Sequence, residues 1–154
     1  MSHTYVFRCR VCHKAIGSPY ISLDRRTQQY STALWKGKPR TTVTILMAQE
    51  LFQYDGQACR ALDEPMVVAE LQLKTTHPSG TTVVPCSRCS IAVDRTLPHV
   101  SYVYLEVEMN AQGEIAKVID DTELAVLCRE CEEPDQPLAE AVADIHEYEE
   151  RTRA

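Results

Sequence analysis

Seven cysteines occur in this chain of 154 residues, and six of them form three Cys-x-x-Cys pairs. A Cys-x-x-Cys turn places two thiolates on one metal ion, and two such pairs complete the closed tetrahedral shell of a structural zinc site. The two pairs in the second half of the chain therefore predict one Zn²⁺ site. Its ligands are Cys86, Cys89, Cys128 and Cys131.

The residues between these two pairs have the pattern of a β-hairpin. The segment 99–109 alternates along much of its length and is rich in β-forming residues, 110–114 has turn composition, and 115–127 returns to the second pair. A hairpin with one cysteine pair near each end resembles the zinc-ribbon class. The resemblance covers residues 86–131 and implies a structural module without implying an activity, because such modules serve many functions.

A second metal site is predicted in the first half, where Cys9, Cys12 and Cys59 offer three thiolates. Three interpretations remain open for this site. It binds zinc with a fourth ligand, it is degenerate and empty, or it is a catalytic zinc site with an open position for water. The candidate fourth ligands are Asp55, Asp63 and His77.

A short internal similarity links the two halves. Residues 59–65 (CRALDEP) match residues 128–134 (CRECEEP), with Leu62 in the place of Cys131. This match predicts two tandem zinc-ribbon-like modules, each closing its own cysteine group rather than exchanging pairs with the other.

The expected fold is mostly β, built of small metal-stapled antiparallel hairpins with a C-terminal α-helix. The expected modules are a basic one at 1–65, a linking β-hairpin at 66–85, an acidic one at 86–134, and an amphipathic helix with a charged tail at 135–154. Within the linker, 66–73 is predicted as a strand. In the last segment Leu138, Val142 and Ile145 share one helical face.

The sequence is typical of a soluble protein in a reducing compartment. No apolar run approaches the roughly 20 residues that span a bilayer, and the N-terminus has no signal-peptide pattern. We therefore expect an intracellular, cytoplasmic protein with no membrane partner, in which paired cysteines bind metal rather than form disulfides.

The charge is unevenly distributed. Residues 1–60 contain nine Lys/Arg against three Asp/Glu, whereas 61–154 contain seven against nineteen. Within the basic half, segment 25–40 interleaves cations with two aromatic residues, a composition suited to phosphate contacts and base stacking. The candidate nucleic-acid-binding residues are Arg25, Arg26, Lys36, Lys38, Arg40, Trp35 and Tyr30. The alternative is that the two aromatic side chains belong to the hairpin core and the cations are merely solvated.

No catalytic residues are predicted. The chain has no glycine-rich phosphate loop, no Gly-x-Ser-x-Gly and no His-Glu-x-x-His sequence. The favoured hypothesis is a non-enzymatic zinc-binding adaptor or regulator that acts on a nucleic-acid-associated machine and also contacts protein. The alternatives are a protein-only interaction scaffold, a thiol redox protein and a zinc hydrolase.

Overall fold

The central element of the fold is a four-stranded antiparallel sheet. The computed structural model describes residues 8–80 and 82–132. The sheet has the spatial order β2-β1-β5-β6. Its strands are β1 (Tyr20–Trp35), β2 (Lys38–Tyr54), β5 (His99–Met109) and β6 (Ile115–Leu127). A second, two-stranded sheet is formed by β3 (Val83–Pro85) and β4 (Ala92–Asp94), and the helices are α1 (Gln57–Glu70) and α2 (Arg129–Glu132). The mostly-β prediction is confirmed.

The two halves of the chain share this one sheet. Each half contributes a hairpin, β1–β2 or β5–β6, and the first strands of the two hairpins pair with each other from Tyr20↔Val107 to Gln28↔His99. The segments 1–65 and 86–134 are therefore not separate bodies on a linker, as the module boundaries would suggest. Their central strands form one continuous hydrogen-bonded ladder.

Local turn chemistry closes both hairpins. Lys36 and Gly37 connect β1 to β2 with positive φ angles of 51° and 76°. Two positive values at the two central residues are what a tight two-residue hairpin turn requires, and glycine adopts them without strain. In the β5–β6 turn the Asn110 Oδ1 atom accepts hydrogen bonds from the N–H groups of Gln112 and Glu114.

The larger hydrophobic core lies between the sheet and the elements that cover one of its faces. Ile21, Leu23, Tyr102 and Leu124 from the sheet are buried there together with Val67 of α1. A smaller buried group occupies the opposite face of the sheet. It consists of Tyr20, Val103, Leu105 and Val107. Because successive side chains of a strand alternate between faces, Tyr20 and Ile21 belong to different groups.

The linking hairpin predicted at 66–85 is wrong in its first half. Residues 66–70 of the strand predicted at 66–73 belong to the end of α1, which continues through Pro65, and Leu71 is the C-terminal cap of this helix. Val67 and Leu71 are four residues apart and both buried, so one face of the helix packs on the core. Packing of this face outweighs the hydrogen bond that Pro65 cannot make. The second half of the linker contains β3, which pairs with β4 rather than with residues 66–73.

The predicted amphipathic helix at 135–154, with Leu138, Val142 and Ile145, lies outside the described residues, and the last described element is α2 at Arg129–Glu132. Among the described residues, no helix is long and apolar enough to cross a membrane.

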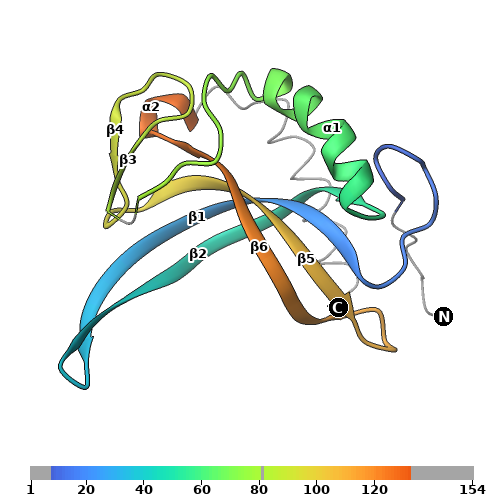
Figure 1. Cartoon of the computed structure of the whole chain (residues 1–154), viewed down its shortest axis with the longest axis horizontal. Helices are drawn as coiled ribbons and strands as arrows, with labels where there is room; N and C mark the ends of the chain where they lie inside the picture. The colour runs from blue at the N-terminus through green and yellow to red at the C-terminus, as the bar shows by residue number, and fades with distance from the viewer. Residues whose placement is uncertain (1–7, 81, 133–154) are drawn as a thin grey trace.

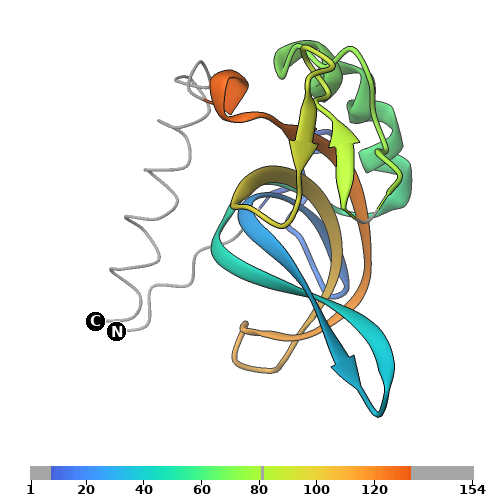
Figure 2. The same cartoon turned by 90° about the vertical axis from the view of Figure 1, so that its left-hand side faces the viewer.

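The sheet is bent into an arch. Figure 1 shows the β1–β2 and β5–β6 hairpins diverging downward on opposite sides, while α1, β3 and β4 lie above the arch. Figure 2 shows β3 and β4 standing over the curved sheet on the same side as α1. Pairing of β1 with β5 ends at Gln28, so beyond it β1 and β2 form a two-stranded ribbon. We call residues 29–44 the ribbon arm.

Candidate metal centres

Four cysteine sulfurs converge where the second half of the chain closes. Cys86 and Cys89 lie in the turn between β3 and β4, Cys128 follows β6, and Cys131 is in α2. Their four sulfur atoms all lie within 4.8 Å of one another, and the sulfurs of Cys89 and Cys128 are 3.6 Å apart. Zn–S bonds of about 2.3 Å give sulfur separations of about 3.8 Å in a tetrahedron. The arrangement fits one tetrahedral metal ion.

The Cys86 turn has a tight backbone geometry. The Cys86 N–H donates to the Ile91 carbonyl at 2.7 Å, and the Ser90 N–H donates back to the Cys86 carbonyl at 2.9 Å. Ser90 has a φ of 69°, the left-handed conformation that lets the chain reverse. This geometry turns both cysteine side chains toward the end of β6.

The electrostatics of this group favour a thiolate at its centre. Burial by itself would raise the pKa of Cys86, but N–H groups of Cys128, Cys89 and Arg88 directed at the sulfur bring the pKa down to about 6. By contrast, burial and the neighbouring sulfurs of Cys128 and Cys89 raise the pKa of Cys131. Four thiolates together repel one another, and a bound cation reverses that repulsion.

The four-cysteine group connects several elements of the fold. The Arg88 guanidinium donates to the carbonyl of Leu71 at the end of α1 and to the carbonyl of Cys131 in α2. The Ser87 N–H donates to the Val126 carbonyl of β6 at 2.8 Å. Residues around the four cysteines thus tie α1, α2 and β6 to the β3–β4 turn.

The three sulfurs of Cys9, Cys12 and Cys59 form a second group, also within 4.8 Å of one another. The two groups follow the sequential arrangement that the sequence predicts, since neither contains a cysteine from the other half. The Cys9 N–H donates to the Lys14 carbonyl at 3.0 Å and the His13 N–H donates to the Cys9 carbonyl at 3.0 Å.

Ionisation in the second group is again uneven. Burial opposes ionisation of Cys9, but main-chain N–H groups of Cys12, Asp55 and Val11 outweigh it and lower the pKa of Cys9 to about 7. Burial, followed by the effect of the Cys9 and Cys12 sulfurs, raises the pKa of Cys59 to about 11. As in the four-cysteine group, a cation is needed to ionise all the thiols of this group together.

The structure distinguishes the three sequence candidates for a fourth ligand. Asp63 accepts a hydrogen bond from the Tyr54 hydroxyl at 2.6 Å and forms an ion pair with Arg10 at 2.7 Å. His77 lies 3.6 Å from Glu64. Asp55 is exposed in the connection between β2 and α1. Within the described residues, the group of mutually close donor atoms contains the three sulfurs only.

The alignment of CRALDEP with CRECEEP is not reproduced by the structure. It predicts Leu62 in the place of Cys131, but Leu62 lies in the middle of α1 and is 71% exposed. Cys59 instead occupies the third position of α1, as Cys131 does in α2. The short sequence match is therefore offset from the structural correspondence, because it pairs Cys59 with Cys128 whereas the structure pairs Cys59 with Cys131.

The predicted basic segment 25–40 divides into two parts. Arg25 and Arg26 lie in the paired region of β1 and are half-buried. Their Nε atoms are buried and have no hydrogen-bond partner among the described residues. Lys36, Lys38 and Arg40 are exposed at the far end of the ribbon arm. The arm thus separates these three cations from the two arginines of the sheet.

The two aromatic candidates also differ in environment. Trp35 is 60% exposed at the tip of the ribbon arm, with the Arg40 guanidinium 6.0 Å from its ring centre. Tyr30 is at the base of the arm, where it packs against His99 at a ring separation of 5.8 Å and beneath Arg95. Trp35 is available to a ligand, whereas Tyr30 is a packed structural residue.

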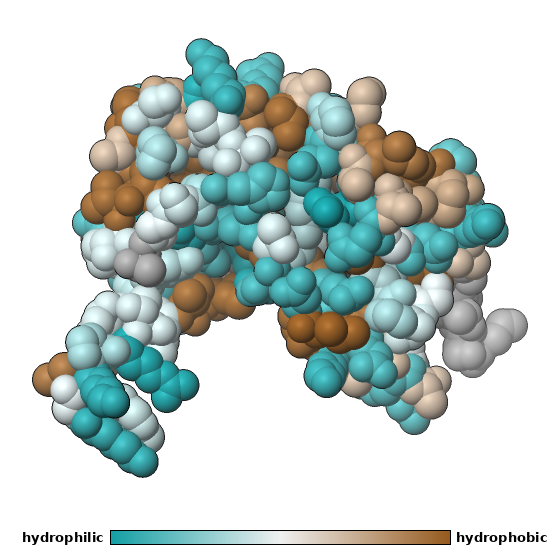
Figure 3. All heavy atoms as spheres, in the orientation of Figure 1, coloured by the Kyte–Doolittle hydropathy of each residue, from teal (hydrophilic) through white to brown (hydrophobic). Residues whose placement is uncertain are grey.

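The ribbon arm has two chemically different faces. Cross-strand pairs Trp35↔Lys38 and Ala33↔Arg40 place Trp35, Lys38 and Arg40 on one face, because side chains alternate along each strand. The pairs Leu34↔Pro39, Thr32↔Thr41 and Tyr30↔Val43 lie on the other face, which carries apolar side chains on either side of two threonines. Figure 3 shows the projecting tip, where hydrophilic side chains dominate around a hydrophobic patch, and the hollow below the arch.

A buried arginine that the sequence analysis does not single out supports the base of this arm. Arg95 follows β4 and is 1% exposed. Its Nη2 atom donates to the Tyr30 hydroxyl at 2.5 Å and pairs with a Glu123 carboxylate oxygen at 2.6 Å. The Arg95 carbonyl accepts the Tyr30 N–H at 2.7 Å. An arginine after a short strand gives no sequence signal of burial, because its partners come from distant strands.

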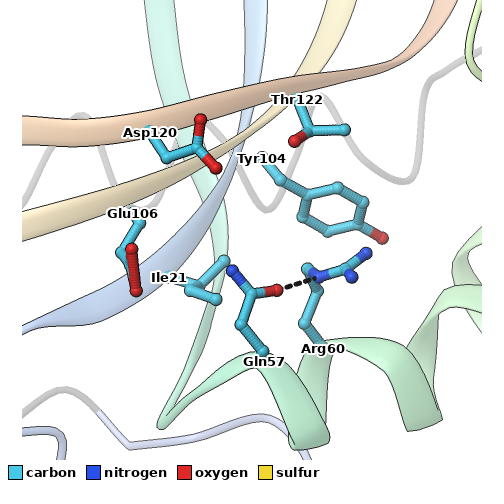
Figure 4. Close-up of a pocket in the computed structure, with 7 residues that line it drawn as sticks. All are labelled: Ile21, Gln57, Arg60, Tyr104, Glu106, Asp120 and Thr122. Carbon is cyan, nitrogen blue, oxygen red and sulfur yellow. Dashed lines mark hydrogen bonds between the residues drawn. The ribbon is translucent and has the colours of Figure 1, made fainter.

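A small pocket is present on the helix side of the sheet. It lies between the start of α1 and the strands β1, β5 and β6 (Figure 4). Its lining residues are Ile21, Gln57, Arg60, Tyr104, Glu106, Asp120 and Thr122. Its volume of about 10 Å³ is room for one water molecule, so this pocket does not accommodate an organic substrate.

Comparison of the chain with protein-family models, with curated proteins and with solved structures gives no match. The function is therefore inferred from the geometry of the chain itself.

Proposed function

We propose that this protein is a non-enzymatic zinc-binding module, built of two zinc-ribbon-like units, that binds nucleic acid through its ribbon arm. The observation that carries the proposal is the composition of the arm. Residues 29–44 contain three Lys/Arg and no Asp/Glu in a chain of net charge −6. These three cations project with one tryptophan on a two-stranded ribbon that has no further strand beside it among the described residues.

Zinc is the ion that the cysteine groups fit best. Four thiolates in tetrahedral proximity form the donor set of closed structural zinc sites, and carboxylate-binding cations such as Mg²⁺ and Ca²⁺ prefer oxygen ligands. Zinc bound at Cys86, Cys89, Cys128 and Cys131 supplies folding free energy to a two-stranded sheet that is too small to be stable by itself.

The arm suits a nucleic-acid groove in size and charge. The major groove of B-form DNA is about 12 Å wide and admits a two-stranded β-ribbon. Lys36, Lys38 and Arg40 would neutralise phosphates along the groove, and Trp35 offers a flat surface for a base or sugar. The acidic residues of the β5–β6 hairpin lie at the other end of the arch and would repel phosphates. We therefore expect binding to be confined to the arm.

The four-cysteine site supports the arm mechanically. The Cys86–Cys89 turn leads directly into β4, and the residues after β4 hold the base of the arm, since the Thr96 carbonyl accepts a hydrogen bond from Gln29 at 2.8 Å. Together with the Arg95–Tyr30 contacts, this bond fixes the direction in which the arm leaves the sheet. A folded metal site would therefore be needed for a correctly oriented arm.

A protein partner is the second candidate, favoured by the apolar face of the arm. Leu34 and Val43 are exposed there. An exposed apolar face of a β-ribbon is a typical protein-docking surface. A protein-only scaffold would use this face and leave the cationic face in solvent.

Binding of a fluorescent DNA duplex at increasing salt tests the proposal. We expect the affinity to fall with salt. The triple variant Lys36→Ala, Lys38→Ala, Arg40→Ala should weaken binding across sequences and reduce the salt slope by about 3, because each cation that neutralises a phosphate adds about one unit to that slope.

The matched control is Lys74→Ala, Lys117→Ala, Arg129→Ala, which removes the same charge from exposed positions outside the arm. Equal weakening by both variants, or no binding by the intact protein at low salt, would reject nucleic-acid binding through the arm and leave the protein-partner alternative.

A further inference from the structure

The two cysteine turns share a backbone hydrogen-bond pattern that allows the two metal sites to be compared atom by atom. In each, the first cysteine donates its N–H to the carbonyl five residues later, Lys14 for Cys9 and Ile91 for Cys86. In each, the residue four positions after that cysteine donates back to its carbonyl and has a positive φ, 62° for His13 and 69° for Ser90. Cys9 and Cys86 are therefore equivalent positions.

The strands that end at each site correspond in the same way. The residue after the first cysteine donates its N–H to the end of a strand. Arg10 donates to the Gln53 carbonyl of β2 at 2.9 Å, and Ser87 donates to the Val126 carbonyl of β6 at 2.8 Å. Gln53 is thus the counterpart of Val126.

Two residues further on, the main chain contacts the first cysteine's sulfur in both sites. The Cys128 N–H donates to the Cys86 sulfur at 3.3 Å, and the Asp55 N–H is hydrogen-bonded to the Cys9 sulfur. Asp55 therefore holds the position of Cys128. Cys59 and Cys131 then correspond as the third residues of α1 and α2. The three-cysteine site differs from the four-cysteine site by one inserted residue, Gly56.

From this correspondence we infer that the Asp55 carboxylate is the fourth ligand of the Cys9, Cys12 and Cys59 site. Asp55 extends from the same backbone position that supplies a thiolate in the other site, and carboxylate oxygen is an accepted zinc ligand at about 2.0–2.2 Å. Its side chain is exposed and lies outside the group of mutually close sulfurs, so ligation requires rotation about its Cα–Cβ bond, which packing does not block. The other two candidates are engaged elsewhere, Asp63 by Tyr54 and Arg10, and His77 beside Glu64.

With Asp55 as a ligand, the two sites are chemically unequal. One site has four thiolates, whereas the other has three thiolates and one oxygen ligand on an exposed connection. Because thiolate is the softer ligand and Asp55 is open to solvent, the three-cysteine site should release its metal more readily than the four-cysteine site. This inference rests on the metal-binding part of the proposed function and is independent of nucleic-acid binding.

Cadmium NMR of the full chain tests the assignment, because each bound cadmium gives its own resonance and the position depends on the number of thiolate ligands. We expect two resonances, one at the four-thiolate position and one shifted in the direction of oxygen ligation. Asp55→Cys should move the second resonance to the four-thiolate position and leave the first unchanged. Asp55→Ala should lower the cadmium affinity of the three-cysteine site by at least about tenfold. Removal of a residue that only supports a metal ligand already costs about tenfold in metal affinity, and removal of a ligand itself should cost no less.

His77→Asn is the matched control, since it removes another sequence candidate from an exposed position and asparagine tolerates its positive φ. It should leave both resonances in place. Unchanged resonances and affinity in both Asp55 variants would overturn the inference, as would metal bound only at the four-cysteine site. Absence of metal from both sites would instead overturn the metal-binding part of the proposed function.

Discussion

The Arg95 guanidinium donates a 2.5 Å hydrogen bond to the Tyr30 hydroxyl and lies 4.2 Å above the centre of the Tyr30 ring. This contact joins residues 65 positions apart in the chain, one following β4 and the other at the base of the ribbon arm. It links the sheet that holds the four-cysteine site to the part of the molecule proposed to bind a ligand. The consequences for stability, metal dependence and binding can be tested separately.

The first prediction concerns the buried charge of Arg95. Glu123→Gln should destabilise the protein by about 3 kcal/mol, because it leaves a buried guanidinium without its anion. Tyr30→Phe should cost only about 1 kcal/mol, since it removes one hydrogen bond and keeps the ion pair. Urea unfolding of the metal-loaded protein measures both. A Tyr30→Phe variant as unstable as Glu123→Gln would show that the ion pair is not the dominant interaction.

The second prediction is that metal at the four-cysteine site fixes the arm. Cys89→Ser should accelerate amide hydrogen exchange at Tyr30, whose N–H donates to the Arg95 carbonyl, because loss of the metal loosens the β3–β4 turn. Cys59→Ser is the control, since it affects the other group and the start of α1. Similar acceleration in the two variants would argue against a specific connection between the four-cysteine site and the arm.

The third prediction separates the two faces of the arm. Trp35 is the only tryptophan of the chain, so its fluorescence reports directly on the tip. Nucleic acid should quench this fluorescence, and Trp35→Ala should weaken binding by about 1–3 kcal/mol if a base stacks on the ring. Leu34→Ala, on the opposite face, should leave nucleic-acid binding unchanged. A larger effect of Leu34→Ala would favour the apolar face and a protein partner.

The fourth prediction concerns pH and His99, which is 4% exposed. Burial lowers the pKa of His99 below its usual 6.5, and the cation of Arg95 adds to this, while the Leu97 carbonyl, Glu123 and Asp94 act in the opposite direction. Below pH 6.5 the unfolded chain therefore binds more protons at this residue than the folded chain, so stability should fall as pH falls.

Replacement of His99 by Asn should reduce this loss of stability below pH 6.5, measured as the difference from the unchanged protein at each pH so that acid release of metal cancels. His77→Asn, at an exposed position, serves as the control. A pH dependence identical in the unchanged protein and His99→Asn would contradict a depressed pKa at His99.

Features that depend on residues close together in the chain can be predicted from the amino-acid sequence. Cys-x-x-Cys spacing predicts all four members of one cysteine group and Cys9 and Cys12 of the other, and the structure brings the sulfurs of each group together. The alternating segment 99–109, the turn at Asn110 and the return at 115–127 have the same bounds as β5, its turn and β6. These elements follow from alternation and turn chemistry within about thirty residues, where few competing contacts exist.

Features that depend on partners far away in the chain appear only in the folded protein. Pairing of β1 with β5 merges the two halves into one sheet, and packing of Val67 and Leu71 keeps α1 helical through Pro65. Contacts with His99 and Arg95 hold Tyr30 half-buried while Trp35 stays exposed, although both are aromatic residues in one basic segment.

The correspondence between the two cysteine groups, in which Asp55 occupies the position equivalent to Cys128, is visible only in backbone hydrogen bonds between separate segments. Which side chains are buried and which strands pair depends on which faces of the strands and helices pack together. Residue type and spacing along the chain do not specify this packing.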